Sequence, residues 1–139
     1  MAVYGNVPLS GTAILEWGST NTGNTTGVQF VNSMAASSAV GATEDFSSKP
    51  MPCAGVLRKI TARFAAAALA GTNCTFTVRI NNVATTVAVT VPATVQQAAS
   101  AEFNIPFAAD DRLSVTSQCV SPDATTSRPR VSVLVSLSA

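Results

Sequence analysis

The sequence contains no histidine, and only 11% of its 139 residues are charged. Without histidine the chain lacks the side chain best suited to proton transfer near neutral pH. Histidine-based catalytic triads, Cys-His proteases and histidine metal sites are therefore excluded. An average soluble domain has roughly 25% charged residues. The low charge leaves hydroxyl and methyl groups to cover the surface, which favours close packing against other subunits because few ions must be desolvated.

The sequence also lacks an excess of charge and a long apolar run, and we expect no secretory leader. A net charge of +1 creates no long-range field that would attract nucleic acid, so we expect no nucleic-acid partner. No apolar run approaches the roughly 20 residues of a membrane helix, so we expect no membrane partner. The first residues, "MAVYGNVPLSG", do not form the charged and apolar regions of a secretory signal. We expect synthesis in a cytoplasm.

Motifs for cofactors and metals are missing as well. The chain has no CxxC pair, no GxGxxG and no GxxxxGK[ST]. We expect its three cysteines, Cys53, Cys74 and Cys119, to be reduced, buried thiols. The carboxylate pairs Glu44-Asp45 and Asp110-Asp111 are predicted to cap turns, and no DxDxDG loop surrounds the second pair to bind calcium. We therefore expect no catalytic, cofactor or metal site, and no enzyme.

What the sequence does contain is alternation of apolar and polar residues, which is typical of strands with one buried face. The segment 73–91, "NCTFTVRINNVATTVAVTV", alternates on both sides of Asn81-Asn82, a pair that tolerates the left-handed backbone of a tight hairpin. Further strands are predicted at 12–18, 26–33, 56–64, 101–107, 112–120 and 130–139. Pro106 marks the strand 101–107 as an edge strand or the end of one. In 56–64, Val56, Ile60, Ala62 and Phe64 are expected on the buried face, with Leu57 and Arg58 as irregularities.

About eight short strands and no convincing helix predict an all-β fold, an antiparallel β-sandwich or jelly roll. We expect a single domain over 1–139, with the main sheet region in 56–139 and a possible extended N-terminal arm over 1–17. Residues 34–52 are expected to be irregular. Lys59 and Arg63 fall on one strand face beside Arg58, either as a solvated face or as a contact with an acidic partner subunit.

Two aromatic residues, Tyr4 and Trp17, lie outside the strongest alternation. Each is either a core residue or an anchor to a partner, because Trp and Tyr give much contact area at little entropic cost.

The region from Gly55 to Ala139 resembles the trimeric jelly-roll proteins of tailed-phage particles, which are similar to tumour necrosis factor and C1q heads. The resemblance rests on "AGVLRKITARF", the hairpin "TFTVRINNVATTVAVTV", and "FAADDRLSV" before the final "VSVLVSLSA". The chain departs from that group by having Asn81-Asn82 in place of Asn-Gly and Asp110-Asp111 in place of Gly-Asp. The resemblance does not extend to residues 1–54.

This resemblance implies a homotrimer in the virion, made in the host cytoplasm and located on the capsid surface. Its implied function is that of a capsid decoration (cement) protein, which binds the major capsid protein and stabilises the assembled shell by mass action. For the capsid contact the N-terminal segment offers Val3, Tyr4, Leu9, Ile14, Leu15 and Trp17, where an arm could add a strand to a coat-protein edge. Two alternatives remain open: a receptor- or carbohydrate-binding fibre tip, and a self-assembling coat protein.

Overall fold

The structure is a computed structural model that describes residues 3–4, 7–8, 11–18, 29–31, 48–65, 73–120 and 129–138. In these segments every regular element is a β-strand, and no helix long and apolar enough to cross a membrane occurs among them. The strands are β1 (Val3–Tyr4), β2 (Val7–Pro8), β3 (Gly11–Gly18), β4 (Gln29–Phe30), β5 (Lys49–Pro50), β6 (Gly55–Arg63), β7 (Asn73–Ile80), β8 (Val83–Val91), β9 (Gln97–Ala99), β10 (Ile105–Phe107), β11 (Arg112–Val120) and β12 (Arg130–Leu137).

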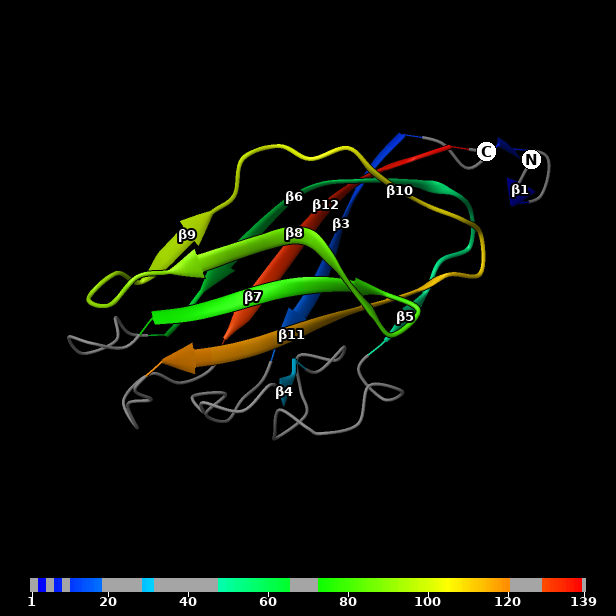
Figure 1. Ribbon diagram of the computed structural model, residues 1–139. Coiled ribbons are helices and arrows are strands. Elements are labelled where there is room, and N and C mark those ends of the chain that lie inside the picture. Colours follow the sequence, from blue (N-terminus) through cyan, green and yellow to red (C-terminus); the bar gives the residue numbers. More distant parts are fainter. Residues whose placement is uncertain are drawn as a thin grey trace.

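Two antiparallel five-stranded sheets stack face to face (Figure 1). One sheet has the order β10-β6-β12-β3, with β9 also paired to β6, and we call it the β12 sheet. The other has the order β4-β11-β7-β8, with β5 also paired to β11, and we call it the β7 sheet. Most connections cross from one sheet to the other, which is the path of a jelly roll. The predicted all-β sandwich is confirmed.

The core lies between the sheets and is built from the inward residues of each strand. Buried side chains include Leu57, Ile60 and Phe64 on β6 and just after it, Phe76 and Val78 on β7, Val87 and Val91 on β8, and Val131, Val133 and Val135 on β12. The rings of Phe64 and Phe76 meet across the two layers with centroids 5.6 Å apart. Such aromatic contacts add to the free energy gained from burial alone.

The hairpin β7–β8 turns at Asn81 and Asn82, whose φ angles of 49° and 70° are both positive. Two positive φ angles define the type I′ turn, so the hairpin predicted from the alternation is confirmed. The alternation in 83–91 predicts Val83 on the same buried face as Val87 and Val91, but Val83 is 67% exposed. Val83 pairs with Ile80 directly after the turn, at the end of both strands. Farther along the hairpin a register shift lies between Thr77 and Arg79, where the hydroxyl of Thr85 donates to the carbonyl of Val78 over 2.8 Å.

A second irregularity corrects the expected pattern of β6. Leu134 pairs with Lys59 and Val135 with Leu57, so Arg58 is an extra residue in the strand. A bulge of this kind reverses the side-chain phase. As a result Leu57 is fully buried while Val56, which was expected inside, is only partly buried.

Three strands of the β12 sheet can be compared with the prediction. β10 pairs only with β6 and contains Pro106, which confirms the expected edge strand, although it begins at Ile105 rather than near residue 101. β9 was not predicted. β12 pairs with both β6 and β3, so the last predicted strand is central to its sheet.

Cys74 and Cys119 form a disulfide between neighbouring strands of the β7 sheet, with an S–S distance of 2.05 Å. The expectation of three reduced thiols was therefore wrong for this pair. The two residues are direct cross-strand partners, a relationship that depends on strand order and cannot be deduced from their spacing. Cys53 is buried and free, as expected.

Candidate docking surface

The outer face of the β12 sheet is formed by the residues that alternate with the core. Along β12, Arg130, Ser132 and Leu134 alternate with the buried Val131, Val133 and Val135 and therefore face away from the core. Glu16 pairs with Ser132 and Ile14 with Leu134, so both also belong to this outer face. Ile14 is 65% exposed. The face thus presents a large aliphatic side chain to solvent beside hydroxyl and charged groups.

One row across this sheet brings two arginines together. Arg130 pairs directly with Arg63 on β6, and on its other side with Gly18 on β3. Arg63 in turn pairs with Gln97 on β9. The row therefore contains two cations side by side and no carboxylate, although like charges directly opposite each other destabilise a sheet. In the described part of the chain the ion pair within 4 Å is that of Arg58 with Glu102, at 3.6 Å.

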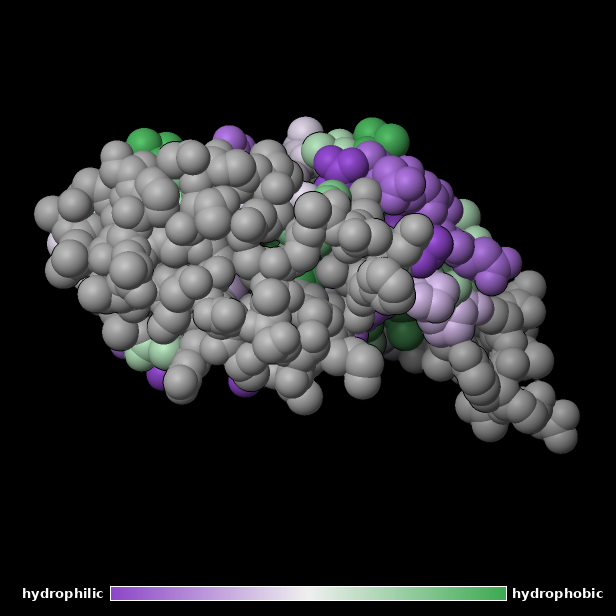
Figure 2. Space-filling view, turned by 90° about the horizontal axis from the view of Figure 1, so that it is seen from below, coloured by the Kyte–Doolittle hydropathy of each residue, from purple (hydrophilic) through white to green (hydrophobic). Residues whose placement is uncertain are grey.

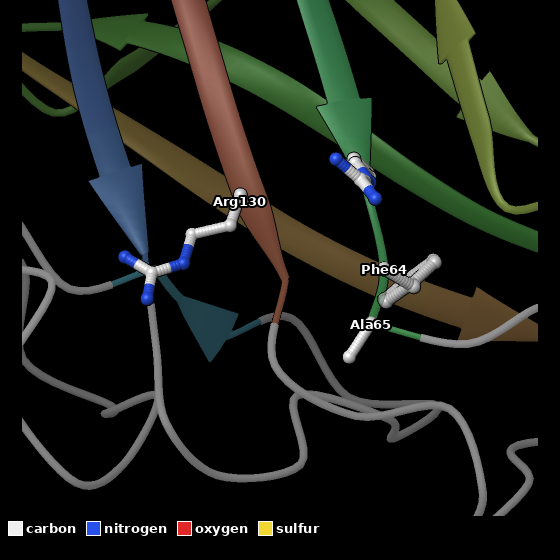
Figure 3. Close-up of a pocket in the computed structure, with 4 residues that line it drawn as sticks. Phe64, Ala65 and Arg130 are labelled. Atoms are coloured by element: carbon white, nitrogen blue, oxygen red, sulfur yellow. The ribbon is translucent and has the colours of Figure 1, made fainter.

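Gly18 makes room for the Arg130 side chain. A Cβ atom at this glycine would lie 2.9 Å from both Cδ and a terminal nitrogen of Arg130. Figure 3 shows the Arg130 guanidinium extended across the end of β3, in agreement with this close approach. A side chain at residue 18 would have to displace the guanidinium.

Shallow hollows follow each other along the same face. One, of about 220 Å³, is lined by Arg63, Phe64, Ala65 and Arg130 (Figure 3). A second, of about 190 Å³, shares Arg130 and is also lined by Glu16, Trp17, Val131 and Ser132. A third, of about 260 Å³, shares Ser132 and is also lined by Ile14, Lys59, Thr61, Ala99 and Leu134. The hollow with the arginine pair is therefore linked to a largely aliphatic one.

Lys49 connects the two sheets at the edge of this face. Its Nζ lies 5.2 Å from the centre of the Trp17 ring, which is a cation–π contact between β5 and β3. Burial lowers the pKa of Lys49 from its ordinary 10.5, while the nearby Glu16 carboxylate acts in the opposite direction. The Glu16 charge is thus partly offset by a lysine.

The turns at one end of the sandwich hold Asp110-Asp111. The Asp111 carboxylate accepts a hydrogen bond of 2.7 Å from the backbone nitrogen of Ala108 and one of 2.6 Å from the side-chain amide of Asn81. The Asp111 carboxylate therefore caps the turn, as predicted for this pair. Among the described residues, no group of three histidine, cysteine or acidic side chains is close enough to hold a metal ion.

Figure 2 shows the molecule from below, where the described residues visible at the surface form a mostly hydrophilic band near one end, with apolar residues at its margins. Among the described residues, the exposed large apolar side chains are those of Ile14, Val83, Val95 and Val120. These four residues lie on different strands and loops and do not form one patch. Ile14 differs from the other three because it lines a hollow together with Leu134.

The residues predicted for a capsid contact differ in their exposure, and not all of them lie in the described part of the chain. Val3 and Tyr4 form β1, which pairs with Val7–Pro8, and Leu9 lies outside the described residues. Ile14 is exposed, and Leu15 packs against the core. Trp17 is only 1% exposed, which corrects its inclusion as an accessible anchor: it is a core residue. Residues 11–18 are a full strand of the sheet, which confirms the strand predicted over 12–18; these residues also belong to the segment 1–17 that was considered as a possible arm.

The arginine pair and the aliphatic hollow were not found from the sequence. Arg63 and Arg130 are far apart in the chain, and only the register of β6 with β12 brings them together. Their position at the ends of alternating segments was visible, but no sequence pattern shows which strands become neighbours.

No protein-family model and no curated protein sequence matches the chain. Among solved structures, the chain is similar to one in the acidic stable capsid structure of Helicobacter pylori bacteriophage KHP30. The two are 13% identical with a TM-score of 0.53, and the match covers 95% of this chain and 93% of the other. At this identity the likeness shows a shared fold over nearly the whole length of both chains.

Proposed function

We propose that this protein is a non-catalytic structural component of a bacteriophage virion, and that it is a capsid decoration protein acting as a homotrimer. The observation that carries the proposal is the likeness, over nearly the full length of both chains, to a chain of a phage capsid structure. The low charge supports the same role, because such a surface loses little hydration energy when subunits cover it.

The mechanism of a decoration protein is thermodynamic. A protein that binds the assembled shell but not its separate subunits stabilises the shell by mass action. The partner in this proposal is the major capsid protein. A rigid sandwich suits the task, since little conformational entropy is lost when preformed strands and exposed side chains meet a partner.

A self-assembling coat protein is the second candidate, because the likeness to a chain of a capsid structure supports it equally. The fibre-tip alternative is weaker for carbohydrate ligands. Lectin sites depend on exposed aromatic side chains, and Trp17 is in the core.

The test begins with purified protein and multi-angle light scattering over a range of concentrations. A mass of three chains supports the homotrimer, whereas large uniform particles would establish a coat protein. The second step mixes the protein with empty capsids of the phage that encodes it and sediments them. Saturable binding that raises the temperature of capsid disruption is expected. Absence of binding, together with absence of the protein from purified virions, would overturn the proposal.

A further inference from the structure

Among the described residues, the outer face of the β12 sheet carries more positive than negative charge. Lys59, Arg63 and Arg130 belong to this face, and none has an ion-pair partner among the described residues. Glu16 is the one described acidic residue of the three hollows, and its charge also acts on Lys49. Arg58 is paired with Glu102. The free charge on this face is therefore mainly cationic, although the whole chain is nearly neutral.

Strand pairing and a neighbouring glycine determine the positions of the two arginines. Cross-strand pairing sets Arg63 and Arg130 directly opposite each other, at a cost in stability that a neutral residue would avoid. Gly18 leaves space in which the Arg130 side chain extends over the end of β3. Two guanidinium groups beside one hollow match the planar, two-oxygen geometry of a carboxylate.

The aliphatic hollow adds a second point of recognition on the same face. It is bordered by Ile14 and Leu134. It begins at Thr61 and Ser132, the cross-strand pair that follows the arginine pair on the same outer face. Apolar pockets next to arginine side chains are frequent centres of binding energy in protein interfaces.

We propose that the outer face of the β12 sheet docks an acidic protein partner, which places a carboxylate between Arg63 and Arg130 and an apolar side chain in the hollow beside Ile14 and Leu134. The inference deepens the proposed function and rests on it in one respect, the assumption that the partner is a protein subunit. Charge complementarity selects the partner: a surface with free cations attracts carboxylates and repels basic surfaces.

The experiment uses the full chain, labelled with ¹⁵N and at the methyl groups, and the blocked peptide Glu-Glu-Leu-Glu-Glu as probe. We expect saturable NMR shifts of the Arg63 and Arg130 side-chain N–H groups together with the Ile14 and Leu134 methyl groups. Arg58 and Arg112, which have partners on the chain, should not shift. The peptide Gln-Gln-Leu-Gln-Gln is the control and should not saturate.

Variants then assign the binding to this face. Arg63→Gln with Arg130→Gln should weaken peptide binding at least about tenfold, the loss of one or more charge-assisted hydrogen bonds. Gly18→Ala should weaken it without any change in charge, because the added Cβ displaces Arg130. Ile14→Ser should weaken it, whereas Val83→Ser, at a site of nearly equal exposure on another strand, should not. Unchanged unfolding temperatures show that each variant is folded.

Several results would overturn the inference. Equal shifts with acetate and with the peptide would mean that the hollow contributes nothing, and tighter binding of a short DNA duplex would assign the face to phosphates. If the protein binds the peptide but not the capsid, the decoration role is contradicted and the docking surface is not. If the double variant Arg63→Gln with Arg130→Gln binds capsids as well as the natural protein does, the docking surface is contradicted and the decoration role is not.

Discussion

Asn81 and Asp111 join two turns that are far apart in the sequence. The side-chain amide of Asn81 donates to Oδ1 of Asp111 over 2.6 Å, and its own Oδ1 accepts from the backbone nitrogen of Arg112 over 2.9 Å. The β7–β8 turn is thereby fixed to the start of β11. One asparagine thus serves two purposes, since its backbone also adopts the positive φ angle of the turn.

Replacing Asp111 by Asn should destabilise the fold. An amide has one acceptor oxygen in place of two, so one of the donors, Ala108 N–H or the Asn81 amide, loses its partner. We expect a loss of about 1 kcal/mol in the free energy of unfolding, measured with urea. Asp110→Asn is the matched control, because it removes the same charge from the same turn. Equal losses for both variants would contradict a specific role of Asp111.

The second turn residue, Asn82, has a φ angle of 70°. A left-handed backbone costs roughly 1–2 kcal/mol for most residues and much less for glycine and asparagine. Asn82→Ala should therefore lower the free energy of unfolding by about 1 kcal/mol, whereas Asn82→Gly should leave it equal or higher. If both substitutions have the same effect in chemical unfolding, the turn is not of the type described.

The Cys74–Cys119 disulfide closes a loop with a sequence separation of 45 residues. Its loss through Cys74→Ala with Cys119→Ala should cost roughly 2–4 kcal/mol of stability, mainly through a less constrained unfolded chain. Thiol titration of the denatured protein should find one thiol per chain before reduction and three after it. Cys53→Ala should remove that one thiol and leave the disulfide intact. Three thiols without reduction would show that the bond is absent.

Lys49 should make stability depend on alkaline pH. Its pKa in the folded protein is lowered mainly by burial, so between that pKa and 10.5 the unfolded chain holds more protons than the folded one. The free energy of unfolding should therefore rise with pH across this window, and the contribution of Lys49 is lost as the pH falls through its lowered pKa.

Urea unfolding of the natural protein and of Lys49→Met at a series of pH values up to 10.5 tests this prediction. Methionine keeps an apolar contact with Trp17 and does not titrate. The free energy of unfolding of the natural protein, relative to that of Lys49→Met, should rise with pH across this window. A constant difference would mean that Lys49 titrates normally.

The sequence predicted the strands wherever alternation alone determined them. β6, β7, β8, β11 and β12 all match expected segments to within a few residues. Errors arose at Val56, where the extra residue Arg58 reverses the phase, and at Val83, which keeps the phase of β8 but is exposed beside the turn. Leu57 and Arg58 were visible as irregularities in the sequence, but whether such a pair forms a bulge depends on the partner strand. Trp17 was ambiguous because one edge strand cannot show which of its faces is covered.

The candidate site was less accessible to prediction than the fold. Ile14 was identified as a contact residue, and Arg63 as a possible contact with an acidic subunit, each from its own strand. Arg130 and Gly18 became relevant only through their pairing in one row. Such a site is a property of strand neighbours, and strand order is set by contacts distant in sequence.

The central position of β12 affects how fast the molecule can fold. β3 and β6 flank β12 and do not pair with each other, so their sheet keeps an opening one strand wide until the final strand enters. Pairings between such distant segments close large loops and slow folding, typically to milliseconds or seconds. During that interval the facing edges of β3 and β6 are open to any extended segment, including β12 of another molecule. At high protein concentration, the open space between β3 and β6 therefore favours insertion of β12 from another chain over pairing with β12 of the same chain.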